Sequence, residues 1–176
     1  MFDTFTPQLL ELFATSLWET VVMVAISGAV GAALGLPLGI LLYLTQPGGV
    51  VPQPVLNRVL GTSVNALRST PFIILLVAII PLTRLLTGSS IGTMAAVVPL
   101  TIAAAPFFAR LIETALHEVD HGLVEAALSM GASTRQIVLK VLLPEAWPGI
   151  VAALTITLVL HQYQRTAPPA YHQRHT

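Results

Sequence analysis

The residues best suited to chemistry with a partner lie together in one run, residues 125–144, which reads EAALSMGASTRQIVLKVLLP in an otherwise apolar chain. Gly131 falls where a helix end favours a residue that adopts a positive φ, so the run predicts two short helices around a glycine. Asp120 is a suitable N-cap for the first helix. Ser133 and Gln136 form a capping-box pattern that opens the second helix.

The chemistry of this run is recognition rather than catalysis. Small residues beside the glycine leave a low surface, on which a partner can lie close to the backbone, and Glu125 can reach a basic group on that partner. Because proline lacks the N–H that a further helical turn needs, the second helix is expected to end at Pro144. An amphipathic hairpin on the membrane surface is the alternative, although such helices usually carry more Lys and Arg.

Patterns for catalysis and for metal binding are missing from the sequence. The chain has no cysteine and no HExxH pattern. His117 and His121 lie four residues apart beside acidic residues, which could in principle hold a metal, but a solvated approach to the run at 125–144 is the favoured interpretation. No Walker A sequence is present. The apolar segments also lack the paired Ser/His or Asp groups of an intramembrane enzyme, so we expect no enzyme activity, no metal and no cofactor.

A second group of polar residues interrupts an apolar stretch just before Pro71. It comprises Asn65, Arg68, Ser69 and Thr70. A charge within a membrane span is by default a functional candidate, so these four residues are candidates for lining a path through the membrane. Two alternatives stay open. Arg68 can equally extend its charged end to lipid headgroups, and the other three can form hydrogen bonds between helices.

The composition of the chain indicates an integral membrane protein. The chain has 176 residues, of which 55% are hydrophobic and 9% charged, and its mean hydropathy is +0.81. Soluble domains average about 25% charged residues. The formal net charge is zero and no basic block is present, so lipid rather than nucleic acid is the expected surrounding.

Four apolar runs predict membrane spans at residues 17–44, 55–82, 93–108 and 148–160. The last run covers about 20 Å at about 1.5 Å per residue, short of a hydrocarbon core of about 30 Å. In the first run, small residues recur every fourth position, at Ser27, Gly31, Gly35 and Gly39. Such a stripe lets another helix approach closely, and packing inside the bundle is preferred to a dedicated dimer contact. Pro37 is expected to kink this span.

The placement of Lys and Arg predicts the orientation of the spans. The segment before the first span has neither residue, whereas the first connection holds Arg58 and the connection at 109–148 holds Arg110, Arg135 and Lys140. The positive-inside rule therefore places the N-terminus outside and residues 125–144 in the cytoplasm, with Arg84 in an outer loop as an exception. The residues that set this bias are Arg58, Arg110, Arg135 and Lys140.

The run at 125–144 resembles the EAA loop of binding-protein-dependent ABC importer permeases. The matching residues are Glu125, Ala126, Gly131, Leu143 and Pro144, with Val141 where isoleucine is commoner. Other stretches resemble the methionine-import branch of that family, and the similarity covers about residues 16–160. These stretches begin at Trp18 (WET), Gly35 (GLPLG), Leu41 (LLYLTQP), Arg68 (RSTPFIIL), Ile80 (IPLTR) and Ala105 (APFFAR).

The resemblance implies an all-α, polytopic membrane helix bundle of the type 1 ABC importer permease kind, with a cytoplasmic pair of coupling helices. About four spans are expected here, against five in the family. It also implies a permease homodimer in the cell inner membrane, two copies of an ATPase subunit docked on the coupling helices, and an extracytoplasmic methionine-binding protein. The residues that the resemblance assigns to contact with the ATPase are Glu125, Ala126, Ala127, Gly131, Ala132, Leu143 and Pro144. ATP would then drive rocking of the spans and import of D- or L-methionine.

The chain divides into an extracytoplasmic segment at 1–15, a permease domain at 16–160 and a polar tail at 161–176, which is expected to be disordered. Because family members continue through a further span, we expect the permease domain to be truncated. Two alternatives stay open for the function. One is a fragment that inserts and docks the ATPase without transporting, and the other is a permease for another amino acid or small polar solute.

Overall fold

The computed structural model describes residues 7–89 and 92–152, and in these ranges the chain forms helices joined by turns. The all-α prediction is therefore confirmed. The chain separates into two compact units, Met1–Glu113 and Thr114–Thr176. The expected polar tail at 161–176 lies outside the described residues.

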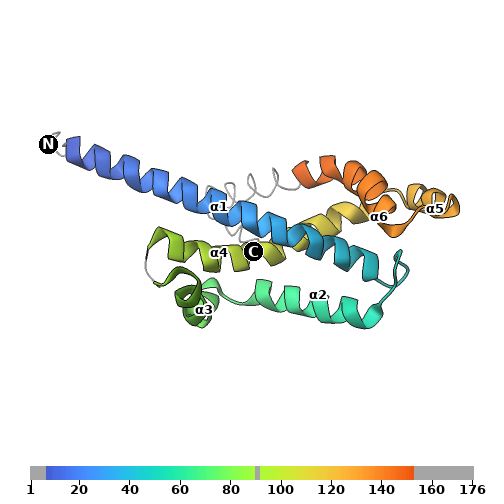
Figure 1. Ribbon diagram of the computed structural model, residues 1–176, viewed down its shortest axis with the longest axis horizontal. Coiled ribbons are helices and arrows are strands. Elements are labelled where there is room, and N and C mark those ends of the chain that lie inside the picture. The colour runs from blue at the N-terminus through green and yellow to red at the C-terminus, as the bar shows by residue number, and fades with distance from the viewer. Residues whose placement is uncertain (1–6, 90–91, 153–176) are drawn as a thin grey trace, which may run out of the picture. The chain divides into compact units, whose positions relative to one another are not determined.

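The first unit begins with a long helix, α1 (Pro7–Thr45), which starts well before the expected span at residue 17 (Figure 1). Residues 7–15 form the first turns of this helix, because Leu, Glu and Ala at these positions favour helix. Pro37 lies inside α1 and does not end it. The unit continues with α2 (Pro54–Ser69), α3 (Phe72–Thr87) and most of α4 (Thr93–His117).

Helix α1 packs closely on α4 through the stripe of small residues. Gly31, Gly35 and Gly39 are buried. A Cβ atom added to Gly35 would lie 2.5 Å from the Phe108 Cβ, and one added to Gly39 would lie 2.6 Å from the Ala109 carbonyl oxygen. No side chain fits at these distances, so the prediction that the stripe serves packing inside the bundle is confirmed.

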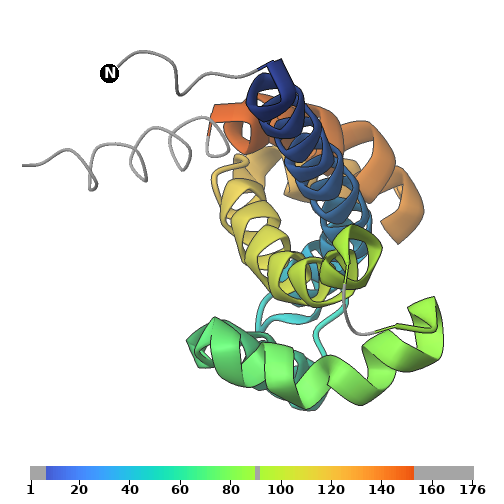
Figure 2. The same cartoon turned by 90° about the vertical axis from the view of Figure 1, so that its left-hand side faces the viewer.

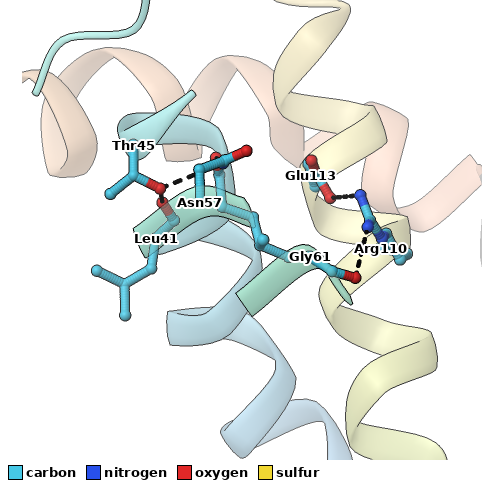
Figure 3. A network of polar contacts seen from close by, with 7 residues as sticks. Leu41, Thr45, Asn57, Gly61, Arg110 and Glu113 are labelled. Atoms are coloured by element: carbon cyan, nitrogen blue, oxygen red, sulfur yellow. Dashed lines mark hydrogen bonds and ion pairs between the residues drawn. The ribbon is translucent and has the colours of Figure 1, made fainter. Parts of the chain in front are cut away.

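The start of α2 is held against the end of α1 by one side chain. The Asn57 amide donates to the Leu42 carbonyl oxygen at 2.7 Å. It also donates to the Thr45 hydroxyl at 3.2 Å (Figure 3). An apolar cluster lies next to these bonds, in which Leu42, Val64 and Ala109 bring together α1, α2 and α4. The hydrogen bonds of the Asn57 side chain and this apolar cluster hold α2 beside α1 and α4.

The expected second span at 55–82 is not one straight helix. Helices α2 and α3 meet at an angle of 109° at Thr70 and Pro71. The helix α2 is seen lengthwise in Figure 1, and α3 is seen lengthwise after the turn to Figure 2. Thr70 is extended, with φ −74° and ψ 127°, because the proline ring disfavours the helical conformation of the residue before it.

Two helical segments, Gln8–Thr45 and Thr93–His117, are each long and apolar enough to cross a membrane. The bent pair of α2 and α3 adds a third span if it is counted as one. Helix α4 extends beyond the expected end at residue 108, with Pro99 and Pro106 inside it. The expected fourth span lies mostly outside the described residues.

The second unit contains α5 (His121–Ser129), α6 (Thr134–Ile137) and a π-helical turn, η1 (Val138–Leu142). Helix continues through residues 143–152, so the prediction that the helix ends at Pro144 is wrong. The Leu143 N–H bonds to the carbonyl oxygen of Val138, five residues earlier. This wider turn just before the proline accommodates a residue that has no N–H and whose ring crowds a regular helical turn.

The close approach of α1 and α4 predicts that Gly35→Ala destabilises the chain. The new methyl group would overlap Phe108 and the carbonyl oxygen of Ala105, and overpacking of this kind costs about 1–3 kcal/mol. Gly28→Ala is the matched control, since a Cβ added there meets no atom within 4 Å. Unfolding of both variants in mixed detergent micelles measures the difference, and equal stability of the two would contradict the packing described.

Candidate functional site

Residues 121–144 form a capped helical hairpin, which we call the coupling segment. The Asp120 carboxylate accepts a hydrogen bond from the Gly122 N–H at 2.8 Å and so caps α5. Gly131 has a φ of +77° and turns the chain after α5. Ser133 and Gln136 form the complete capping box at the start of α6. The N-cap, the glycine turn and the capping box predicted from the sequence are all confirmed.

The two faces of the coupling segment differ in exposure. Val124, Ala127, Ile137 and Leu142 are buried. Glu125 is exposed and forms no ion pair within the described part of the chain. Of the other predicted contact residues, Ala126, Gly131 and Pro144 are exposed, Ala132 and Leu143 are half-buried, and Ala127 is buried. Most of the predicted contact set is therefore available to a partner, while Ala127 serves the inside of the hairpin.

The exposed face also carries large apolar side chains that sequence reasoning did not place there. Met130 is 81% exposed, next to the glycine that turns the chain, and Leu123 and Leu128 are exposed on α5. Exposed methionine in such a position adapts to the shape of a partner surface.

The predicted path residues lie in the last turns of α2 and at the break that follows. Asn65, Arg68 and Ser69 are exposed, and Thr70 is half-buried. The hydroxyls of Ser69 and Thr70 both donate to the Ala66 carbonyl oxygen, at 3.1 and 2.8 Å. These two hydroxyls therefore bond to a backbone carbonyl group at the end of their own helix and not to another helix.

A polar link between α4 and α2 was missed by sequence reasoning, which used Arg110 only to orient the spans. Arg110 Nη1 forms an ion pair of 2.8 Å with Glu113 Oε2, and Nη2 donates to the Gly61 carbonyl oxygen at 3.2 Å (Figure 3). The spacing of opposite charges three residues apart indicated the ion pair. The bond to Gly61 joins residues 49 positions apart, and no local pattern predicts it.

Metal binding finds no support in the geometry of the described residues. Within residues 7–89 and 92–152, no three His, Cys, Asp or Glu side chains lie close enough together to hold a metal ion. His117 and His121 therefore belong to no such group.

Long apolar helices, together with a helix pair broken within the apolar region, are typical of a polytopic membrane protein. The family described as "Binding-protein-dependent transport system inner membrane component" matches residues 35–161. The chain belongs to this family of multi-pass inner-membrane permeases, and the resemblance stated from the sequence is confirmed.

Within the family, the chain is similar to methionine permeases. It is 60% identical over 149 residues to the probable D-methionine transport system permease protein MetI of Vibrio cholerae. The match covers 85% of this chain and 66% of that protein. Its identity to the D-methionine transport system permease protein MetI of Escherichia coli K12 is 54%, covering 84% of this chain and 68% of that protein. The chain thus spans about two thirds of the length of these relatives.

Among solved structures, the chain is similar to a subunit of the MetNI methionine ABC transporter in inward facing conformations. The TM-score is 0.84 at 51% sequence identity, and the match covers 89% of this chain and 72% of that subunit. This similarity confirms the predicted permease fold.

The positive φ of Gly131 predicts a graded response to substitution. Nothing lies within 4 Å of a Cβ added there, so the backbone conformation alone is tested. We expect Gly131→Ala to destabilise the hairpin by about 1–2 kcal/mol, and Gly131→Asn to cost less because Asn tolerates the left-handed region. Hydrogen exchange of the α5 and α6 amides measures local opening. Equal exchange in the wild type and both variants would contradict this description of the turn.

Proposed function

We propose that this chain is the permease subunit of an ATP-driven importer that moves methionine into the cytoplasm. The observation that carries the proposal is the coupling segment, a rigidly capped hairpin that presents an exposed acidic and apolar face. The relatives described above, whose names give D-methionine as the transported solute, support the choice of methionine. ATP hydrolysis is assigned to a separate subunit because the chain has no Walker A sequence.

The ATPase subunit is the proposed partner of the coupling segment. The contact residues are Glu125, Ala126, Gly131, Ala132, Leu143 and Pro144, to which the exposed Met130 is added. Glu125 would pair with a basic group of the ATPase, and the small residues would let that subunit approach the backbone. The proposed assembly contains a permease homodimer, two ATPase subunits and an extracytoplasmic methionine-binding protein. The permease domain would be residues 16–160, with the N-terminus outside and the coupling segment in the cytoplasm, as the distribution of Lys and Arg supports.

The break between α2 and α3 is the proposed location of the translocation path. A break within an apolar region leaves backbone groups without helical partners, which is tolerated where protein or a water-filled cavity covers them. Asn65, Arg68, Ser69 and Thr70 lie at or just before this break and add polar side chains to it. The combination supports a wetted path next to the end of α2.

Transport would proceed by alternating access. ATP brings the two ATPase subunits together, and the docked coupling segments convert this closure into rocking of the spans. The path then opens outward to receive methionine from its binding protein. Hydrolysis and product release return the path to the cytoplasmic side.

The proposal predicts ATP-dependent uptake of labelled methionine into vesicles that contain this chain, the ATPase and the binding protein. Unlabelled D- and L-methionine are expected to compete, whereas an amino acid of unrelated side chain is not. Co-purification of the ATPase without any uptake would contradict the transport function. Uptake of another amino acid in preference to methionine would contradict the choice of substrate.

The proposed docking role predicts that Glu125→Lys abolishes the association with the ATPase while the chain still inserts into the membrane. The change places a like charge opposite the basic group expected on the ATPase. Glu145→Lys is the matched control, because Glu145 is also exposed in the second unit but lies just outside the coupling segment. Co-purification at equal expression is the measurement, and normal association in the Glu125→Lys variant would disprove this role.

A further inference from the structure

The ion pair and hydrogen bond of Arg110 form a mechanical link between two helices with different proposed tasks. We propose that Arg110 is a positioning residue that makes α2 move together with α4 during transport. This inference rests on the proposed function, since it assigns a route by which movement at the ATPase side reaches the path residues at the end of α2.

The geometry of the link favours a defined position over a loose contact. The Arg110 guanidinium holds Glu113 with one nitrogen, at 2.8 Å, and the Gly61 carbonyl oxygen with another, at 3.2 Å. The side chains of Arg110 and Glu113 are only 27% and 13% exposed. A planar guanidinium that bonds on two sides in a poorly solvated place holds a fixed orientation better than a flexible ammonium group.

The partner in α2 is a backbone group in mid-helix, not a side chain. A carbonyl oxygen has two lone pairs, so that of Gly61 can accept from Arg110 in addition to its bond within the helix. A Cβ added to Gly61 would lie 3.4 Å from Arg110 Nη2, so the guanidinium lies close against the α2 backbone at this position. Since the bond is to the backbone, it constrains α2 as a whole rather than one movable side chain.

The two helices connect different parts of the proposed mechanism. Along the chain, α4 ends at His117 and is followed within a few residues by α5 of the coupling segment. Helix α2 ends at Ser69, among the proposed path residues. A fixed bond from Arg110 to Gly61 therefore lets a displacement of α4 carry the polar end of α2 with it.

The first measurement is the ratio of methionine imported to ATP hydrolysed, in vesicles with the ATPase and the binding protein. We expect Arg110→Gln to keep ATP hydrolysis and docking but to lower this ratio at least about tenfold, the effect of losing a hydrogen bond to a charged group. Arg110→Lys should restore part of the ratio. The control is Arg58→Gln, an exposed position on α2, whose ratio should stay within about twofold of the wild type.

The second measurement does not depend on transport. The chain has no cysteine, so spin labels can be attached at Val59→Cys on α2 and Phe107→Cys on α4, both exposed positions. The labelled chain is diluted into an excess of unlabelled, cysteine-free chain, so that most labelled dimers hold one labelled protomer. In the complex with the ATPase, we then expect one narrow distance distribution with and without ATP. In the Arg110→Gln background the distribution should broaden and change when ATP is added.

The outcomes separate the two proposals. Failure of the wild-type chain to import methionine would overturn the proposed function. The spin-label distances would then be the remaining test of whether Arg110 holds α2 to α4. Import by the wild type with an unchanged ratio in Arg110→Gln would overturn the positioning role. Unchanged distances in that variant would overturn it as well.

Discussion

The close contact of α1 with α4 is the constraint on which the rest of the first unit depends. In a lipid environment, apolar side chains gain little by leaving lipid for protein, so helices associate where their backbones can approach closely. Gly31, Gly35 and Gly39 provide such an approach along one face of α1. With α1 and α4 fixed in this way, α2 is positioned by the Asn57 amide at its start and by Arg110 in its middle.

The polar contacts specify the register between helices, which the apolar packing alone does not determine. Close packing of small residues fixes the distance between two helices but does little to prevent their sliding, whereas hydrogen bonds specify a register. Asn57 and Arg110 both bond to backbone carbonyl oxygens, so each bond sets the position of a whole helix. Beyond these bonds α2 ends at Ser69, where the path residues are proposed to lie.

Short-range rules explain which features the sequence predicts well. The N-cap at Asp120, the turn at Gly131 and the capping box of Ser133 each depend on residues within a few positions, and all three are confirmed. The glycine stripe also predicts close packing, because a period of four residues places small side chains on one helix face.

Two kinds of feature were missed: contacts between residues far apart in the sequence, and departures from regular α-helical hydrogen bonding. Pro144 was expected to end a helix, but a π-helical turn just before it lets the helix continue. Residues 55–82 were predicted to form one span, and no local pattern predicts that the chain bends by 109° at Thr70 and Pro71. The bond from Arg110 to Gly61 depends on how α2 and α4 pack, and neither residue indicates the other.

The central claim is that the coupling segment lies in the cytoplasm and is covered there by the ATPase. A single cysteine at the exposed Ala126 position of this cysteine-free chain reports on both points through labelling with a membrane-impermeant maleimide. We expect labelling in inside-out vesicles, none from the outside of intact cells, and protection when the ATPase is bound. Labelling from outside, or labelling that the ATPase does not reduce, would contradict it.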